Sequence, residues 1–408
     1  MNPSRRTPLR VLAYSHDSFG LGHLRRSMSV VSAMVRRDGR VHALCVTGSP
    51  MPDLFDMPPR CDVVKLPCIT KDADGEYQSR TLPVPFYEVV RLRSDLILAS
   101  IRAFRPDLVL VDHAAHGAGG ELVPVLRKLR HEAIRTRVVL GMRDVLDAPH
   151  RVRAQMASQR THDVLRNAYD ELLVYGDPRV LDVGDAYDLP ADLRAKISYV
   201  GIACQRDAVP APAPRRESAT PQILATAGGG ADGYSVLRGL IAALRGPLRT
   251  ADLRATIVAG PLMAADDLGA LKLAALNDAR IEVLVATREM NKLLDRADLV
   301  VGMGGYNSVY EAISRGRRLL VWPRSQPRLE QLERCRRLAA LGLLAMLRDE
   351  DLVDPESFAQ HLREALARGT PDVAASGLSF DGAERAAERL LDGVDSARHA
   401  SFRIAAAP

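Results

Sequence analysis

The sequence has few cysteines and few aromatic residues, and both shortages exclude classes of protein. Five cysteines are scattered over 408 residues without a C-x-x-C pair. Neither a disulfide framework nor a cysteine zinc site is therefore expected. Aromatic residues make up 4% of the chain, and no nucleic-acid-binding motif occurs. Because single-stranded nucleic acids are bound on aromatic stacking platforms, we expect no nucleic-acid partner.

Long apolar runs and lysine are also scarce. No stretch approaches the roughly 18 consecutive apolar residues that mark a membrane-spanning helix, and the first ten residues, MNPSRRTPLR, lack the apolar centre of a signal peptide. These two absences predict a cytoplasmic protein. Arginine supplies 50 of the 56 basic residues, which is typical of a chain from a GC-rich bacterial genome.

Positive charge is concentrated near the start of the chain. The formal net charge is +6, and residues 1–40 hold eight arginines against two aspartates. A basic region attracts phosphate groups or an anionic membrane surface, so peripheral contact with the inner face of a membrane is one expectation. The alternative is an arginine-rich surface that is simply solvated.

Short apolar strands alternate with amphipathic helical segments along the whole chain. Apolar residues at helical spacing, for example, are Leu24, Met28, Val31 and Val35. A second helix is expected over 87–104. The predicted strands cover 10–15, 41–47, 62–67, 107–112, 137–141, 171–176, 222–230, 254–260, 280–286, 297–305 and 317–323. This alternation predicts an α/β fold with two Rossmann-like βα domains that face each other across a cleft.

A proline-rich stretch, VPAPAPRRESATP, separates the two runs of strands. It has charges and no apolar period, which is typical of a linker. We expect an N-terminal domain over 1–205, a linker over 206–221, a C-terminal domain over 222–394 and a weakly ordered tail over 395–408. Ligands of such domains bind at the carboxyl ends of the strands.

Two glycine-rich turns resemble nucleotide-binding motifs but fail their tests. In SFGLGHLRRS, Arg25 stands where a dinucleotide fingerprint needs its third glycine, and the next strand ends without a carboxylate. In TAGGGADGYS, Tyr234 replaces the lysine of a P-loop, so ATP hydrolysis is not supported. Both turns still bring backbone N–H groups to a helix N-terminus, where an anion binds. A tight turn without ligand is the alternative.

Polar side chains follow three strands of the first domain. His23, after Gly22, opens the first helix and suits a general base, because a helix N-terminus keeps imidazole neutral. A surface or helix-capping histidine is the alternative. The other candidates are Asp112 with His113 and Arg143 with Asp144, for which turn-capping pairs are the alternative.

A third glycine turn follows the strand at 297–305. Gly304 and Gly305 lead into a helix that carries Asn307, Ser308 and Glu311. Ser308 and Glu311 also fit a capping box, a purely structural explanation. After the next strand come Glu330 and Gln331, and carboxylates at such turns suit sugar and ribose hydroxyls. The DADG sequence at 72–75 lacks the further ligands of a calcium loop, so no metal is expected.

The stretch GGYNSVYEAISRGRRLLVWPRSQPRLEQLERCRRLAALGL resembles the donor-binding region of GT-B-fold glycosyltransferases. The nearest branch contains the bacterial peptidoglycan N-acetylglucosaminyltransferase (family 28-like) and uncharacterised predicted glycosyltransferases. The segments GLGHLRRS, PDLVLVDHAAHGAGGEL, GMRDVLDAP and YGDPRV are similar to that group too. The likeness covers essentially the whole chain. It implies a GT-B fold with the nucleotide sugar in the C-terminal domain and the acceptor beside the N-terminal one.

The resemblance also implies roles for individual residues. Glu311 matches the carboxylate that binds the ribose hydroxyls, and Glu330 and Gln331 match the pair that reads the sugar hydroxyls. Thr287 and Arg288, in ATREM, match the loop beside the base. The positions that match phosphate-facing turns are Gly228, Gly229, Gly230, Gly304, Gly305, Asn307 and Ser308. His23 matches the histidine of the first-domain glycine loop, adjacent to the acceptor. The other acceptor-side candidates, chosen by their places in that loop and at strand ends, are Gly22, His113, Arg143 and Asp144.

These observations predict an inverting, metal-independent glycosyltransferase that uses a nucleoside-diphosphate sugar, with UDP as the expected nucleotide, and no cofactor. His23, or Asp112 alone or paired with it, would take the acceptor's proton. The first loop, DSFGLGH, is less glycine-rich than the corresponding loop of the peptidoglycan enzyme. The lipid-acceptor features of that enzyme are not reproduced in this sequence. The acceptor therefore stays open among small molecules, saccharides and lipid-linked saccharides. Two alternatives are a nucleotide-sugar epimerase of the same architecture and a non-catalytic nucleotide- or phosphate-binding partner protein.

Overall fold

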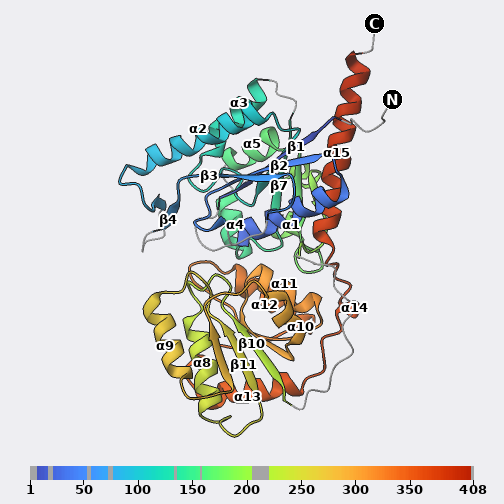
Figure 1. The fold of residues 1–408 in the computed structure, drawn as a ribbon. Helices are drawn as coiled ribbons and strands as arrows, with labels where there is room; N and C mark the ends of the chain where they lie inside the picture. Colours follow the sequence, from blue (N-terminus) through green and yellow to red (C-terminus); the bar gives the residue numbers. More distant parts are fainter. Residues whose placement is uncertain are drawn as a thin grey trace, which may run out of the picture. The chain divides into compact units, whose positions relative to one another are not determined.

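The computed structural model divides the chain into two compact units (Figure 1). Unit 1 consists of Met1–Ala203 and Ser379–Pro408, and unit 2 of Cys204–Leu378. The structure describes residues 7–16, 22–52, 57–71, 77–132, 136–156, 159–204 and 220–405. Gly20, the DADG loop and most of the predicted linker lie outside these ranges. The arrangement of the two domains across a cleft stays a prediction.

Unit 1 is built on a seven-stranded parallel sheet in the order β3-β2-β1-β6-β7-β8-β9. Its strands are β1 (Leu9–Ser15), β2 (Val41–Thr47), β3 (Cys61–Lys65), β6 (Leu108–Asp112), β7 (Arg137–Arg143), β8 (Glu171–Tyr175) and β9 (Ile197–Tyr199). Every residue of β6 and β8 is buried, as expected for parallel strands that are covered on both faces. A separate antiparallel pair, β4 (Ile69–Lys71) and β5 (Tyr77–Ser79), was not predicted.

The helices of unit 1 follow the predicted alternation. They are α1 (Gly22–Arg37), α2 (Phe86–Phe104), α3 (Leu122–His131), α4 (Pro149–Met156), α5 (Gln159–Ala168), α6 (Val183–Ala186), α7 (Ala191–Arg194) and α15 (Gly382–Ala405). The apolar face predicted for the first helix is buried at Leu24, Met28, Val31 and Val35. Helix α2 begins one residue before the predicted 87–104.

Unit 2 has a six-stranded parallel sheet in the order β12-β11-β10-β13-β14-β15 and an apolar core of its own. Its strands are β10 (Gln222–Thr226), β11 (Arg254–Val258), β12 (Ile281–Leu284), β13 (Leu299–Met303), β14 (Arg318–Trp322) and β15 (Ala345–Met346). The helices are α8 (Tyr234–Arg245), α9 (Ala265–Ala275), α10 (Met290–Arg296), α11 (Tyr306–Ser314), α12 (Glu330–Ala340), α13 (Pro355–Ala367) and α14 (Val373–Ser376).

Both sheets have a topological switch point at their first strand. In unit 1 the chain passes from β1 to β2 on one side and returns to β6 on the other. In unit 2, β10 lies in the same way between β11 and β13. Ligands of open α/β sheets bind outside the carboxyl ends of the strands at such points. The α/β prediction with two Rossmann-like domains is confirmed, and each switch point marks where a site is expected.

The C-terminal helix departs from the prediction. The expected division placed 222–394 in the second domain and 395–408 in a weakly ordered tail, but α15 is a helix to Ala405 and belongs to unit 1. It packs along α1 (Figure 1). Its apolar side chains at Leu390 and Val394 are buried, and this apolar stripe attaches the helix to the rest of unit 1.

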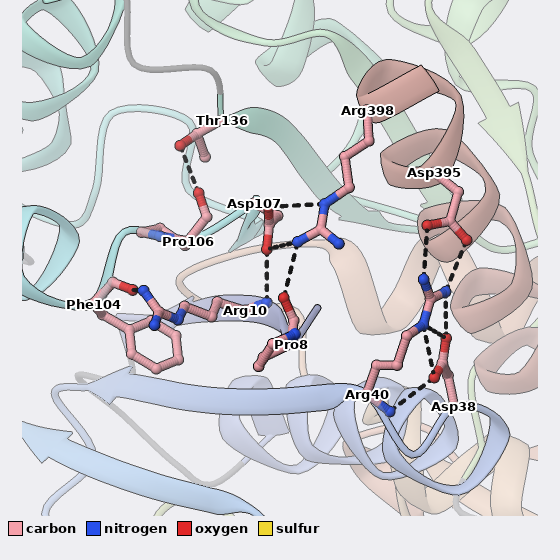
Figure 2. A network of polar contacts seen from close by, with 10 residues as sticks. All are labelled: Pro8, Arg10, Asp38, Arg40, Phe104, Pro106, Asp107, Thr136, Asp395 and Arg398. Carbon is pink, nitrogen blue, oxygen red and sulfur yellow. Dashed lines mark hydrogen bonds and ion pairs between the residues drawn. The ribbon is translucent and has the colours of Figure 1, made fainter. Parts of the chain in front are cut away.

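Ion pairs connect α15 to the rest of unit 1. The Arg40 guanidinium lies between Asp38 and Asp395, with Nη2 at 2.7 and 2.8 Å from their carboxylate oxygens (Figure 2). Arg398 of α15 donates to Asp107, whose other oxygen accepts the backbone N–H of Arg10 (Figure 2). These contacts connect the two ends of the sequence.

Four of the eight arginines in residues 1–40 pair with acidic side chains. Arg26 pairs with Asp112 and Arg40 with two aspartates, while Arg36 and Arg37 pair with glutamates of α15. The expected basic surface therefore carries less free charge than the sequence suggests, and contact with a membrane surface stays a prediction. No helix in the described part of the chain is long and apolar enough to cross a membrane.

Candidate functional site

Two glycine turns of unit 2 lie side by side. Strands β10 and β13 pair in parallel with Thr226 opposite Gly302, so the turns that follow them leave the same edge of the sheet. A methyl group placed on Gly228 would lie 3.6 Å from Ser308 Oγ. The turn at 227–233 and the first turn of α11 are therefore neighbours at the switch point.

Close backbone packing explains part of the glycine content. Gly230 has φ +100°, and a methyl group on it would lie 2.6 Å from the carbonyl oxygen of Ala259. A methyl group on Gly304 would lie 2.6 Å from Cys335 Sγ. At Gly305, by contrast, a methyl group would meet nothing within 4 Å. Packing therefore requires Gly230 and Gly304 but leaves the surface at Gly305 open.

The two helices that open at these turns have no side-chain caps. The N-cap of α8 is Gly233 and that of α11 is Gly305, and neither helix start is closed by a side-chain hydrogen bond. The capping box considered for Ser308 and Glu311 is wrong, because α11 already begins at Tyr306. The dipole and the N–H groups of a helix start favour an anion there.

The carboxylates predicted for this edge are buried. Glu311 lies on α11 with 2% of its surface exposed, and Glu330 opens α12 with 5% exposed. Gln331, next in the chain, lies against the glycine turn, since a methyl group on Gly304 would be 3.1 Å from its Cβ. The predicted sugar-reading pair, Glu330 and Gln331, and the glycine turn at 304–305 are therefore neighbours.

Arg324 is a member of this region that the sequence analysis missed. It follows β14, and its Nη2 donates to Glu330 Oε1 at 3.0 Å. Its Nη1 donates to Asp232 Oδ2 at 2.6 Å, and its backbone N–H donates to Gln331 Oε1 at 3.2 Å. One arginine therefore contacts both the glycine turn at 227–233 and the Glu330–Gln331 pair.

Thr287 and Arg288 also lie at the carboxyl ends of the strands, but beside the outermost strand, β12. They occupy the connection from β12 to α10, two strands away from β10. Thr287 Oγ1 accepts the backbone N–H of Glu289 at 2.9 Å, which orders the turn, and the Arg288 side chain is exposed. Their role beside a base stays a prediction.

Three histidines gather at the switch point of unit 1. His16 follows β1, His23 lies in the first turn of α1, and His113 follows β6. The ring centre of His23 lies 4.2 Å from that of His16 and 5.3 Å from that of His113. His16 was not predicted, although its position directly after the first strand could have marked it.

Asp112, the last residue of β6, holds His23 in place. Its Oδ2 lies 2.6 Å from His23 Nδ1, and Arg26 donates to both of its oxygens at 2.8 and 2.6 Å. Arg26 Nη2 also lies 3.2 Å from His23 Nδ1, but its shorter contacts are with the carboxylate. Burial raises the pKa of Asp112, yet Arg26 and His23 outweigh burial and lower the pKa to about 2. Asp112 is therefore ionised at neutral pH.

The other two histidines are held neutral. Burial lowers the pKa of His16 well below 6.5, and the neighbouring His23 adds to this. Burial also lowers the pKa of His113, with Arg143 as the next cause. Arg143 Nη2 lies 3.4 Å from His113 Nε2, and Asp144 is buried beside them in the chain. His113 has a φ of +64°, a strained conformation for a residue with a side chain.

Most of the predicted residues fall into one group in each unit, while Thr287 and Arg288 lie two strands away. Unit 1 gathers His23, Asp112, His113 and Arg143 with Gly22 at the start of α1, and unit 2 gathers the two glycine turns with Glu330 and Gln331. Among the described residues, no three His, Cys, Asp or Glu side chains are arranged to hold a metal ion. What the arrangement offers is anion-binding backbone in one unit and an oriented imidazole in the other.

Comparison with solved structures identifies the fold as that of GT-B glycosyltransferases. The glycotransferase of kitacinnamycin is 16% identical, with a TM-score of 0.60 over 95% of this chain and 98% of that chain. MurG of Acinetobacter baumannii is 16% identical, with a TM-score of 0.58 over 95% and 100%. A putative UDP-N-acetylglucosamine 2-epimerase of Listeria monocytogenes is 14% identical, with a TM-score of 0.62 over 96% of each chain. The sequence itself matches no protein-family model and no curated protein.

Proposed function

We propose that this protein is an inverting, metal-independent glycosyltransferase that moves a sugar from a nucleoside diphosphate to a hydroxyl group of an acceptor. One observation carries the proposal: two helix starts with glycine N-caps, those of α8 and α11, lie close together at the carboxyl ends of paired strands. The GT-B fold supports it. UDP is the first candidate nucleotide, because a structural neighbour is described as acting on UDP-N-acetylglucosamine.

In this proposal unit 2 binds the donor. The diphosphate lies on the N–H groups at Gly228–Gly230 and at the start of α11, where Asn307 and Ser308 add polar side chains. The two helix dipoles stabilise the charge that develops on the diphosphate as it leaves, so no metal is required. Glu311 binds the ribose, Glu330 and Gln331 the sugar hydroxyls, and Thr287 and Arg288 flank the base.

In unit 1, His23 acts as the general base and Asp112 orients it. A carboxylate with a pKa of about 2 that is 2% exposed is too weak and too enclosed a base for a hydroxyl group. With its Nδ1 proton directed at Asp112, His23 presents Nε2 to the acceptor. The hydroxyl proton passes to Nε2 while the hydroxyl oxygen bonds to the anomeric carbon. The bond from that carbon to the diphosphate breaks on the opposite face, which inverts the configuration.

A thermal-shift panel of UDP, dTDP, GDP and ADP tests the donor site. A ligand at 100 times its Kd stabilises the native state by about 2.7 kcal/mol, so one of the four should raise the melting temperature measurably. If none of the four diphosphates shifts the melting temperature, the donor site does not exist as proposed. The acceptor is a small molecule, a saccharide or a lipid-linked saccharide, and the protein acts in the cytoplasm or at the inner face of the membrane.

An epimerase is the second candidate, because the Listeria neighbour shares the fold. An epimerase needs no acceptor, so the donor sugar alone decides between the two. Incubation of the protein with UDP-N-acetylglucosamine, followed by NMR of the sugar, would reveal a second epimer if this reading is right. An inert or slowly hydrolysed donor favours the transferase.

A further inference from the structure

Arg324 connects two parts of unit 2 that the sequence keeps about 90 residues apart. Its guanidinium contacts both Asp232 in the glycine turn at 227–233 and Glu330 at the start of α12. Its backbone N–H fixes Oε1 of Gln331, so the amide NH₂ group of that side chain points away from the Arg324 backbone. Three contacts from one residue therefore set the geometry of the turn and of the pair together.

The Arg324–Asp232 ion pair does little for stability. The Arg324 side chain is 23% exposed and that of Asp232 is 49% exposed, and solvent screens a pair of this kind. Asp232 also stands directly before Gly233, the N-cap of α8. A carboxylate at that position would repel a diphosphate at the helix start unless a cation neutralises it. The pair is better explained by ligand binding than by folding.

We infer that Arg324 is a positioning residue of the donor site: it neutralises Asp232 beside the diphosphate and holds Glu330 and Gln331 in place for the sugar of a UDP-sugar. This inference rests on the proposed function. It assigns two separable effects to one side chain, an electrostatic effect on the diphosphate and a geometric effect on the sugar. Removal of Asp232 should cancel the first effect and leave the second.

The experiment is a double-mutant cycle measured by calorimetry. UDP and UDP-N-acetylglucosamine are titrated into the full-length protein and into the variants Arg324→Met, Asp232→Asn and Arg324→Met/Asp232→Asn. Arg249→Met, which removes an exposed arginine of the same unit, is the matched control. Arg324→Lys keeps the charge, and thermal melting of each variant verifies that it is folded.

Arg324→Met should weaken UDP binding about tenfold, because the Asp232 carboxylate would then repel the diphosphate without a neutralising cation. Adding Asp232→Asn should restore UDP affinity to near the wild-type value, while the extra affinity of the UDP-sugar stays lost. Arg324→Lys should retain UDP affinity and lose part of the sugar contribution. A merely structural arginine would not give rescue by Asp232→Asn.

Two results would overturn the inference without touching the proposed function. One is wild-type affinity for both ligands in a folded Arg324→Met protein. The other is a double variant that binds UDP as weakly as Arg324→Met. If the wild-type protein binds neither UDP nor UDP-N-acetylglucosamine, the proposed donor site and the inference fail together.

Discussion

The Nδ1 atom of His23 lies 2.6 Å from Oδ2 of Asp112, across 89 residues of sequence. The contact joins the first turn of α1, the helix that follows β1, to the end of β6, the strand beside β1. Arg26, one turn after His23 on the same helix, donates to both oxygens of the carboxylate. The imidazole is therefore oriented by a charge that is itself fixed, and this arrangement leads to the first two predictions.

Replacing His23 with alanine should remove most of the activity. Loss of a general base typically slows a reaction by about 10²–10⁴-fold, and release of nucleoside diphosphate from the donor measures the rate. Binding of UDP should stay unchanged, because the proposed donor site lies in unit 2. His42→Ala, an exposed histidine on β2, is the control and should keep full activity. A His23→Ala protein with wild-type turnover would exclude this residue as the base.

Replacing Asp112 with asparagine should lower both activity and stability. Arg26 is 2% exposed and would lose its ionised partner, and an unpaired buried charge typically costs about 3–5 kcal/mol. Urea unfolding measures this loss, and the donor assay measures the effect on turnover. Asp38→Asn, which leaves Arg40 its second partner Asp395, should cost much less. Equal stability of the two variants would contradict the assignment of Asp112 as a buried counter-ion.

The free energy of unfolding should fall as the pH drops below about 6.5. His16 and His113 have folded-state pKa values below the 6.5 of an unfolded histidine, so below that pH the unfolded chain binds more protons than the native one. Each neutral histidine can contribute a slope of at most about 1.4 kcal/mol per pH unit. Asp112 affects stability at lower pH. Its contribution to the free energy of unfolding is complete above pH 3.8 and is lost as the pH falls towards 2.

Urea titrations between pH 8 and pH 5 test this pH dependence. Stability should be flat above pH 7, and His113→Gln should reduce the slope below it, because one proton-linked group is gone. The matched control is His42→Gln, the same substitution at an exposed histidine on β2. A wild-type profile without a decline between pH 6.5 and pH 5 would show that the two imidazoles are not held neutral.

Glu311→Gln should weaken the binding of UDP. If the carboxylate accepts from the ribose hydroxyls, losing its charge removes a charge-assisted pair that contributes about 1.5–3 kcal/mol. Glutamine keeps the size of the side chain, which matters because Glu311 is 2% exposed. Calorimetry with UDP gives the affinity, and Glu282→Gln on β12, an exposed site, is the control. Unchanged affinity in a folded Glu311→Gln protein would count against the ribose contact.

Gly230→Ala and Gly269→Ala should change stability in opposite directions. At Gly230 a side chain meets both a φ of +100° and the Ala259 carbonyl at 2.6 Å, so destabilisation of at least about 1–2 kcal/mol is expected. Gly269 lies within α9 with open space around it, where alanine typically stabilises by about 0.5–1 kcal/mol. Urea unfolding of both variants provides the measurement. Two variants of equal stability would refute the close packing of the 227–233 turn.

The fold was predictable because it depends on periodic local signals. Eleven apolar runs separated by helical segments predicted eleven strands, and all of them form. The short strands β9 and β15 have three and two residues, too few for a pattern to emerge. The C-terminal helix was misjudged because alanines and charges dominate its sequence, and its apolar stripe is recognisable only against α1.

The candidate site was only partly predictable, for a different reason. Turns at strand ends marked the glycines and His23, since position along the chain is enough to locate them. Arg26 could have been found as well, because it lies three residues after His23 and shares its helix face. Arg324 could not, since nothing in the sequence indicates that its partner is Asp232, 92 residues earlier. Pairings between distant turns follow from the order of strands in the sheet, which the sequence leaves open.

Helix α15 makes the order of synthesis differ from the order of assembly. When Ala203 has left the ribosome, the face of α1 that receives α15 is still uncovered, and Asp107 and Arg40 lack their late partners. The whole of unit 2 is one uninterrupted segment, Cys204–Leu378, that is translated before those partners appear. A chain that ends at Leu378 would therefore contain all of unit 2, while unit 1, which is synthesised first, would still lack its last helix.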